Sequence, residues 1–329
     1  MADWTWTTAD ALTMQTWSKK FWIEAQEESY FYGQGLVGGD ENNSVVIEFP
    51  DLEQSQGYRH HWGQIRNISG PGVIGDSIME GHEEVPNVYE ESIDLNQVRN
   101  AIRTAGKLSE QYPSDKRARH WATQLLKRWM AERIDQDLFT AIAASPTKAL
   151  YGGDATGLTS IEAGDYLTLA LTSKAKAYAQ KATPKIMPVS VKGKRYYVQV
   201  NAPDATFDLK ERDAAFGQAM REAQRPGWDN PIFSGADGIW NETIYHTHAK
   251  VPVATNYGVG LNLNGACCLF MGVGAAGIAY AKRKIWQEKD FDYGNKVGFC
   301  IGAIYGVAKA IFNSADNAVV AIRVYRTSN

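Results

Sequence analysis

The spacing of hydrophobic and polar positions changes several times along the chain, and the longest regular stretch indicates a helix. Apolar residues there recur at every fourth position: Ala122, Leu126, Met130, Ile134, Leu138 and Ile142. That spacing places them on one face of an α-helix. Ser114-Asp115 is typical of a helix start and Ser145-Pro146 of a helix end, so we predict a helix from Asp115 to Ala144. Four further residues widen the apolar stripe, namely Ala118, Trp121, Leu125 and Trp129.

Ahead of this helix the pattern favours strands separated by turns. We expect a helix around Leu12 to Ser29 and strands at Val45–Phe49, Tyr58–Asn67 and Val88–Leu95. Ser69-Gly70-Pro71-Gly72 and Gly75-Asp76 are turn sequences between the last two strands. Long connections inside compact domains are uncommon and usually functional. We therefore predict a projecting β-hairpin with its tip near Gly70 to Asp76.

The rest of the chain mixes both patterns and predicts an α+β fold. The expected helices run from the capping box at Thr159-Ser160-Ile161-Glu162 to Lys181 and from Asp208 to Gln224. The expected strands are Arg195–Val200, Trp240–Val253, Val297–Phe312 and Ala318–Tyr325. Within the third of these, bulky residues alternate with Gly298, Gly302 and Gly306, so one face is open to a closely approaching element.

Composition bounds the class of protein. With 329 residues, 44% of them hydrophobic, the chain can bury a full core. The start, MADWTWTTAD, lacks the basic and apolar regions of a signal peptide. Three cysteines, Cys267, Cys268 and Cys300, do not make a disulfide framework, so we expect folding in a cytoplasm. The uncharged stretch from Val251 to Ala281 is broken by Pro, Asn and Gly, and predicts a buried strand and a small-residue helix rather than a membrane span.

Charge divides the chain into an acidic front and a basic body. Residues 21–106 hold four Arg and fifteen Asp and Glu, a net of 4 − 15 = −11, and contain no Lys. Residues 107–329 hold twenty-eight bases and twenty acids, a net of +8. Complementary surfaces steer association and fix register. The alternative is that both regions are merely solvated.

Aromatic residues are concentrated near the N-terminus. Among them are Trp4, Trp6, Trp17, Trp22, Tyr30, Phe31 and Tyr32. Aromatic side chains bury large areas and dominate the energetics of interfaces. We therefore consider two interpretations: a terminal arm that docks on another molecule, or a segment that completes the chain's own core.

The sharpest enzymatic candidate is a glycine motif. Gly272-Val-Gly274-Ala-Ala-Gly277 has the GxGxxG spacing, follows the apolar run Cys267–Met271 and precedes a helix-like Ile278–Lys284. This is the context of a dinucleotide fingerprint, in which the glycines let the backbone reach a pyrophosphate. Two features oppose that interpretation. No second strand places an acid near a ribose, and only 52 residues follow Gly277 in the 329-residue chain.

Other candidate sites are weaker. His60-His61 and His246-x-His248 lack the supporting ligands of a zinc site, so we expect no metal. No nucleophile elbow, P-loop or HExxH sequence is present, and we expect neither catalysis nor a cofactor. The basic clusters at Lys116-Arg117-x-Arg119, Lys192-x-Lys194-Arg195 and Lys282-Arg283-Lys284 keep a basic-patch nucleic-acid binder open. A pI near 6.1 argues against tight binding of that kind.

Several segments, in order along the chain, resemble the N-four-type family of tailed-phage major capsid proteins. The matching runs are Gly75-Asp76 with Met79-Glu80-Gly81-His82-Glu83-Glu84, Ile93-Asp94 with Arg99, Asp115-x-Arg117-x-x-x-x-Ala122 with Leu125 and Trp129, Asn230-Pro-Ile-Phe-Ser-Gly-Ala-Asp-Gly-Ile-Trp-Asn-Glu-Thr243, and Asp292-Tyr293-Gly294-Asn295 ahead of a Gly-rich strand ending in Lys309. The resemblance implies the Hong Kong 97-type coat fold. That fold has an N-terminal arm, an extended loop, a spine helix, a peripheral domain and an axial domain.

The resemblance implies a division of the chain and an assembly role for named residues. The parts would be the arm at 1–44, the extended loop at 45–95, the spine helix and peripheral domain at 96–150, a mainly axial domain at 151–289, and C-terminal strands returning to the peripheral domain at 290–329. The expected interface residues are Gly70, Pro71, Gly72, Val73, Ile74, Gly75, Asp76, Glu83 and Glu84 in the loop, Trp4, Trp6, Trp17 and Trp22 in the arm, and Trp121, Leu125 and Trp129 on the spine helix.

A shell protein is therefore the expected function. Copies would assemble as pentamers and hexamers around double-stranded DNA without sequence-specific binding, with scaffold and portal proteins as partners, a decoration protein as a further candidate and no membrane. The place would be the virion, after assembly in a host cytoplasm. In the fold's prototype a loop lysine forms an isopeptide bond with a neighbour's asparagine. Since residues 21–106 contain no Lys, we expect a shell without that covalent link.

Overall fold

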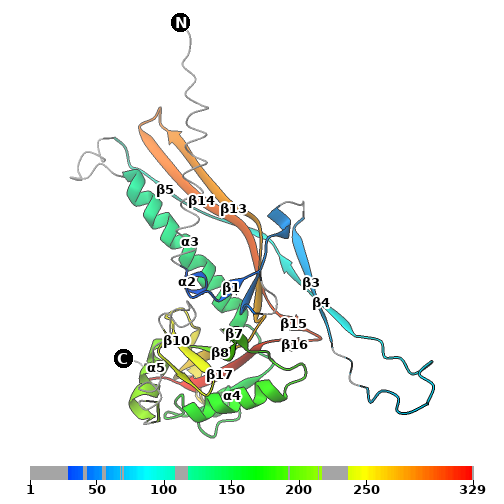
Figure 1. Cartoon of the computed structure of the whole chain (residues 1–329). Helices are drawn as coiled ribbons and strands as arrows, with labels where there is room; N and C mark the ends of the chain where they lie inside the picture. The colour runs from blue at the N-terminus through cyan, green and yellow to red at the C-terminus, as the bar shows by residue number, and fades with distance from the viewer. Residues whose placement is uncertain are drawn as a thin grey trace.

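The structure is a computed structural model, and it describes residues 29–39, 43–53, 57–66, 68, 70–107, 118–191, 193–213, 215–216 and 236–327. Two larger sheets, a long helix and a projecting hairpin organise these residues (Figure 1). The α+β class predicted from the sequence is confirmed. Short elements at the front are α2 (Tyr30–Gly33) and the 3-10 turn η1 (Asp51–Glu53).

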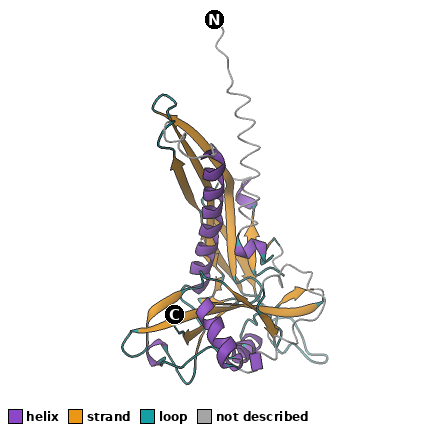
Figure 2. Ribbon diagram, turned by 90° about the vertical axis from the view of Figure 1, so that its left-hand side faces the viewer, coloured by secondary structure: helices purple, strands orange, loops and turns teal. Residues whose placement is uncertain are grey.

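The first sheet, here called the long sheet, has the strand order β1-β2-β13-β14-β5. Its strands are β1 (Val37–Gly38), β2 (Val46–Phe49), β13 (Ala276–Phe291), β14 (Lys296–Lys309) and β5 (Asn96–Arg103). The antiparallel pair β13–β14 forms an extended ribbon, and helix α3 (Ala118–Ala143) runs alongside it (Figure 2).

The second sheet, here called the lower sheet, has the order β6-β17-β12-β8-β10-β9. Its strands are β6 (Ala149–Tyr151), β17 (Val319–Tyr325), β12 (Leu263–Met271), β8 (Lys194–Asn201), β10 (Thr243–Thr247) and β9 (Gly238–Trp240), with β11 (Val253–Tyr257) on β12 and β7 (Val189–Val191) on β8. Helices α4 (Leu169–Lys181) and α5 (Pro203–Arg212) pack on this sheet. Thr172 of α4 hydrogen-bonds Gln199 of β8, and Thr206 of α5 hydrogen-bonds Thr247 of β10.

The apolar stripe predicted for the long helix is buried. Ala122 is 4% exposed, Leu126 1%, and Met130, Ile134, Leu138 and Ile142 are all at 0%. The stripe packs on β14, where Phe299, Ile301 and Tyr305 are 3–4% exposed. The widening of the stripe was wrong for two residues, since Trp121 is 50% and Leu125 61% exposed. The long sheet covers one side of the helix, and a stripe of four-residue spacing already fills that side.

The glycine face predicted for β14 is confirmed, because another strand lies against it. A Cβ on Gly306 would be 2.2 Å from the carbonyl oxygen of Asp94 in β4 (Val88–Asp94). Any larger residue at this position therefore pushes β4 away. This close approach seats the base of the hairpin β3 (Arg59–Ile65)–β4 on the long sheet.

A buried ion pair joins the end of α3 to the turn between the two sheets. Lys309 Nζ lies 2.7 Å from Asp316 Oδ2, and the two side chains are 3% and 2% exposed. The same ammonium donates to the carbonyl of Ala144, while Asp316 Oδ2 accepts from the backbone N–H of Thr147. Asp316 lies in β16 (Ala315–Asp316), which pairs with β15 (Ile311–Phe312). The joint is thus held by a paired and hydrogen-bonded charge.

Two predicted helices have other boundaries. The predicted capping box at Thr159 does not start a helix: Thr159 lies inside the 3-10 turn η3 (Leu158–Ser160), whose N-cap is Gly157. Asp165 accepts a hydrogen bond from the backbone of Glu162, and Gly164 adopts φ +123°, so the chain leaves the helical path. Helix α4 begins after Thr168, whose hydroxyl accepts from the N–H of Leu171. Its end at Lys181 is as predicted.

The second of these helices begins at Pro203 rather than at Asp208, because proline suits the first helical position. Asp208 is not a cap: its buried carboxylate binds the N–H and the hydroxyl of Thr327. α5 ends at Arg212, and the predicted end at Gln224 lies outside the described residues.

Two further expectations were wrong in detail. Trp240–Val253 is not one strand, because Asn241 and Glu242 take positive φ angles of 47° and 61° and reverse the chain between β9 and β10. Ile278–Lys284 is not a helix but the middle of β13. The strands Val45–Phe49, Arg195–Val200, Val297–Phe312 and Ala318–Tyr325 are confirmed within one or two residues, apart from a break at Ala310.

Candidate assembly surfaces

The predicted hairpin is present, with β3 and β4 paired from Arg59↔Asp94 to Ile65↔Val88. At its open end the Arg59 guanidinium binds the Asp94 carboxylate at 2.5 and 3.1 Å. The hydrogen bond from Arg59 lowers the pKa of Asp94. Even-numbered side chains of β3 face the body and odd-numbered ones face solvent, as the alternating burial of this strand requires.

The loop beyond the hairpin projects away from both sheets (Figure 1). Its apolar side chains are uncovered: Ile68 is 68% exposed, Ile74 86%, Ile78 74%, Met79 50% and Val85 85%. The structure places the predicted interface residues in this loop. All are exposed except the half-buried Val73, the set being Gly70, Pro71, Gly72, Val73, Ile74, Gly75, Asp76, Glu83 and Glu84. Gly72 and Gly75 take φ angles of +68° and +73°. Residues other than glycine rarely adopt such positive angles.

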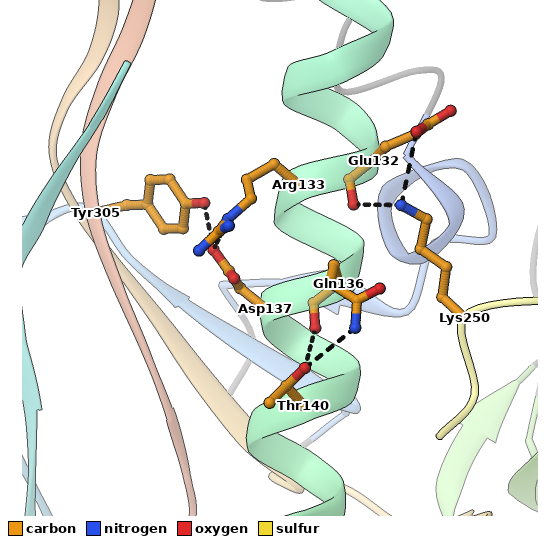
Figure 3. Close-up of polar contacts among 7 residues, drawn as sticks. All are labelled: Glu132, Arg133, Gln136, Asp137, Thr140, Lys250 and Tyr305. Carbon is orange, nitrogen blue, oxygen red and sulfur yellow. Dashed lines mark hydrogen bonds and ion pairs between the residues drawn. The ribbon is translucent and has the colours of Figure 1, made fainter. Parts of the chain in front are cut away.

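The spine helix offers a different kind of surface. Polar side chains along α3 contact both neighbours of the helix (Figure 3). Asp137 accepts a hydrogen bond of 2.7 Å from the Tyr305 hydroxyl on β14 and one of 3.1 Å from Arg133. Lys250 donates to the carbonyl of Glu132 at 2.9 Å. Trp121 and Leu125 lie near the start of the helix and are exposed, whereas Trp129 is half-buried against the core.

The described part of the arm starts at Ser29, which is bound to a buried carboxylate of α3. Asp135, 4% exposed, accepts hydrogen bonds from the Ser29 hydroxyl (2.6 Å) and from the backbone N–H groups of Tyr30 (2.8 Å) and Phe31 (3.4 Å). Burial raises the pKa of Asp135, and these hydrogen bonds oppose that rise. The carboxylate therefore fixes Ser29 and the start of α2 on the spine helix.

The first described aromatic residues pack inside the subunit. The Tyr30 ring lies 4.7 Å from the His248 ring and 5.9 Å from the Phe139 ring, and Phe31 is fully buried. Desolvation, followed by the nearby Lys250, lowers the pKa of His248 to about 4. For Tyr30 and Phe31 the own-core interpretation thus holds. Trp4, Trp6, Trp17 and Trp22 lie outside the described residues, and their role stays a prediction.

One exposed feature was not assigned a role in advance. The turn between β13 and β14 carries Tyr293, which is fully exposed, and three successive residues, Asp292, Tyr293 and Gly294, have positive φ angles. Nearby, the Arg103 guanidinium lies 5.5 Å and the Lys289 ammonium 5.1 Å from the Phe291 ring. The sequence Asp-Tyr-Gly-Asn, with a glycine that tolerates positive φ, was the signal of this tip.

The glycine motif at 272–277 does not form a dinucleotide site. It connects two strands, β12 and β13, and no helix N-terminus follows it within the described part of the chain. Gly277 instead admits packing of Phe49 and Ile93, since a Cβ there would lie 2.9 Å from each. Gly272 lets the strand pass Ile186 and Met187 in the same way. These glycines are needed for close packing between elements.

The histidine pairs lie in different surroundings. His246 is buried in β10, His248 stacks on Phe139, and His60 packs on the Phe49 ring at 4.4 Å. Among the residues described, no group of three His, Cys, Asp or Glu side chains is placed to hold a metal ion. No described helix is both long and apolar enough to cross a membrane.

Comparisons with known proteins agree on one class. The profile of a family described as "phage capsid protein" matches residues 5–148 and 141–325. The major capsid protein of Pseudomonas phage KPP25 is 27% identical over 342 aligned positions, covering 91% of this chain and 89% of that protein. The capsid of Ralstonia phage GP4 has a similar structure, with a TM-score of 0.84, 28% identity and coverage of 91% and 92%. The capsid of cyanophage Pam1 has a TM-score of 0.76 at 21% identity, with coverage of 90% and 92%.

Proposed function

The chain belongs to the phage capsid protein family and is a major capsid protein with the Hong Kong 97-type fold, and we propose that its copies assemble as pentamers and hexamers around double-stranded DNA. The capsid interpretation of the sequence is confirmed, and the dinucleotide alternative has lost its structural basis. The protein is located in the virion, as part of the capsid. We further infer assembly in the host cytoplasm and no catalytic activity.

The observation that carries the assembly proposal is the projecting loop. A loop with Ile74, Ile78 and Val85 at least 74% exposed has these side chains uncovered by the described residues of its own subunit. Large exposed apolar surfaces mark interaction sites, because burying each such side chain is worth about 1.5–3 kcal/mol. A neighbouring copy that covers the loop supplies the missing contact. The acidic Asp76, Glu83 and Glu84 then select a basic surface on that neighbour.

We propose the following roles for the parts of the chain. Residues 1–44 form the arm, 45–95 the extended loop, and 96–150 the spine helix with part of the peripheral domain. Residues 151–289 form mainly the axial domain, which includes most of the lower sheet. Residues 290–329 return towards the peripheral domain through β14 and end with β17 in the lower sheet. The arm tryptophans, the loop tip and the exposed Trp121 and Leu125 contact neighbours.

We also propose scaffold and portal proteins as partners, with a decoration protein added to the outside. The test of the assembly proposal is negative-stain electron microscopy of the purified protein, alone and after coexpression with a scaffold from the same phage. Closed shells of uniform size are the expected result. Monodisperse monomers under both conditions would contradict the proposal. Dissociation by detergent and heat should give one band near 36.4 kDa, because the loop has no lysine for an isopeptide link.

A further inference from the structure

A groove lies at the base of the hairpin, between β3 and the segment leading into β7. Its volume is about 620 Å³, within the range of specific binding sites. Its lining includes Phe49, Trp62, Gln64, Lys185, Met187 and Phe312. Three of these form an aromatic wall, since the Trp62 ring lies 5.2 Å from the Phe49 ring and 5.6 Å from the Phe312 ring.

Strand β3 presents an open edge to this groove. β3 pairs only with β4 among the described strands. Two backbone hydrogen bonds, from the N–H of Arg66 to the carbonyl of Asn87 and from the N–H of Leu95 to the carbonyl of Tyr58, show which residues bond across the hairpin. Because this bonding recurs at every second residue of an antiparallel pair, the even-numbered residues of β3 bond to β4. The backbone N–H and C=O groups of His61 and Gly63 therefore point away from β4, and both residues line the groove. Such an edge is a template for one more strand.

Two buried side-chain atoms in the groove wall also lack partners. Trp62 Nε1, a donor, and Gln64 Oε1, an acceptor, make no hydrogen bond although both atoms are buried. The Gln64 amide is already oriented, because its Nε2 donates to Asn317 Oδ1 at 2.9 Å. Leaving a buried polar atom unpaired costs about 1–3 kcal/mol. Both atoms are buried in the free subunit, so an incoming segment bonds to them only where the groove wall repacks.

The N-terminal sequence has the pattern that this groove requires. Trp4-Thr5-Trp6-Thr7 alternates large aromatic and small polar residues, which is the period of a half-buried strand. On an added strand, Trp4 and Trp6 would lie on the same face as Trp62 and Gln64, and Thr5 and Thr7 on the same face as His61 and Gly63. Two tryptophan rings in the groove would pack against the aromatic wall of Phe49, Trp62 and Phe312.

We propose that residues 4–7 of a second copy add a strand to the free edge of β3 and insert their tryptophans into this groove. The inference rests on the proposed shell assembly and names one of its contacts. In the subunit's own chain Ser29 is bonded to Asp135 of α3, whereas β3 lies on the other side of β13 (Figure 1). The residues from Trp6 to Ser29 span roughly 45 Å with the predicted helix around Leu12 to Ser29 formed, and up to roughly 75 Å when fully extended, which gives the arm the length to reach beyond its own subunit.

A disulfide pair tests this contact directly. Assembled particles of Thr5→Cys/Gly63→Cys are oxidised mildly, alkylated and run on a non-reducing gel, with Thr7→Cys and His61→Cys combinations to cover the register. Cysteine fits at position 63, because a Cβ there would meet only the Tyr89 carbonyl at an ordinary 3.5 Å. Adjacent strands lie about 4.8 Å apart, within the reach of a disulfide. We expect linked dimers and higher multiples in at least one combination.

The matched control is Thr5→Cys/Glu90→Cys. Glu90 is exposed and pairs with Gly63 on β4, so an arm strand on the free edge of β3 would be about two strand spacings away, too far for a disulfide. Normal particles with no link in any β3 combination would overturn the inference and leave shell assembly intact. A link within one chain, seen as a faster monomer band, would also overturn it, in favour of the subunit's own arm.

A second measurement serves if the cysteine pairs prevent assembly. In wild-type particles the amides of His61 and Gly63 should exchange with solvent at least tenfold more slowly than in Trp4→Ala/Trp6→Ala particles. Equal rates in the two would contradict the added strand. Failure of the wild type to form any particle would instead contradict the proposed shell function.

Discussion

The joint below the spine helix and the loop beyond the hairpin are opposite in construction. At the joint, Lys309 and Asp316 are at most 3% exposed and bind each other and the end of α3. In the loop, Ile74 and Val85 are at least 85% exposed and belong to neither core cluster of the described residues. The two charges of the joint pair within one chain, although Asp316 Oδ1 has no hydrogen-bond partner among the described residues. The apolar groups of the loop are left uncovered by the described residues, and we propose that a neighbouring copy covers them, so that folding and assembly depend on different residues.

The largest expected effect comes from the loop. Ile74→Asp/Val85→Asp should abolish shell formation, because two apolar contacts with a neighbour become two buried charges. The free energy of unfolding of the free subunit should change by less than about 0.5 kcal/mol, as for other exposed positions. Electron microscopy and urea unfolding measure the two quantities. Ile74→Val/Val85→Ile is the control, and it should assemble; equal loss in both variants would remove the case for apolar contact.

The next largest effect concerns the joint. Lys309→Met leaves the Asp316 carboxylate buried without its partner and should destabilise the free subunit by about 3–5 kcal/mol. Urea unfolding is again the measurement. Lys296→Met serves as the control, because Lys296 pairs with Asp292 at a surface where the two side chains are 34% and 54% exposed. There the expected change is below about 1 kcal/mol. Similar losses in both variants would show that the buried ion pair contributes no more to stability than the exposed one.

The arm anchor should have an intermediate effect. Asp135→Ala leaves the Ser29 hydroxyl and the N–H of Tyr30 without an acceptor and should cost the free subunit about 2–3 kcal/mol. The control is Gln136→Ala, one residue along the same helix, where the lost bond to Thr140 is exposed. A proteolysis assay should show faster cleavage near residue 29 in Asp135→Ala alone. Unchanged cleavage would mean that Asp135 does not anchor the arm.

Acid should weaken the packing around His248. Its pKa is lowered to about 4 in the folded subunit, against about 6.5 when unfolded, so its neutral form stabilises the fold. This contribution is complete above pH 6.5 and is lost as the pH falls towards 4. We expect a loss of about 1–2 kcal/mol after allowing for the exposed part of the ring. The raised pKa of Asp135 acts in the opposite sense.

Replacing His248 isolates its share of the pH dependence. His248→Gln keeps the size and an acceptor for the Lys250 N–H, but it does not titrate. The difference in unfolding free energy between wild type and variant should shrink from pH 7 to pH 4. A difference independent of pH would show that His248 does not titrate as its burial implies.

The smallest expected effect is that of long-range charge. Assembly should weaken modestly as salt rises from 0.15 M, because the acidic loop and a basic neighbour are screened beyond about 8 Å. Glu83→Lys/Glu84→Lys should mimic high salt, whereas Glu83→Gln/Glu84→Gln should lie between this variant and wild type. Light scattering follows the rate of assembly. If rates respond to neither salt nor charge, the charge division has no role in assembly.

The sequence predicted those elements that local pattern determines. The helical spacing from Ala122 to Ile142 and the turn residues between β3 and β4 depend on residues near in the chain, and both predictions are confirmed. For the small-residue segment after Gly277 the sequence predicts a helix, whereas the structure has β13 there. Its neighbours in space, Phe49 and Ile93, come from strands more than 180 residues earlier and impose the extended form, which no local signal shows.

The candidate surfaces were predictable in part. The loop tip was located by its glycines, and the loop is exposed as expected. The buried Lys309–Asp316 pair and the anchor at Asp135 could not be predicted, because the partners of Asp135 lie more than 100 residues away and Lys309 meets the distant end of α3. The open edge of β3 likewise depends on which strands pair, a property of the whole fold.

Hydrogen exchange in free subunits and in assembled shells tests the central claim most directly. The claim is that one chain completes its body alone and leaves the hairpin loop for a neighbour. Amides of residues 70–86 should exchange rapidly in free subunits and at least tenfold more slowly in shells. Amides of α3 from Leu126 to Ile142 should be protected in both states. Equal, rapid exchange of the loop in subunits and shells would contradict the account.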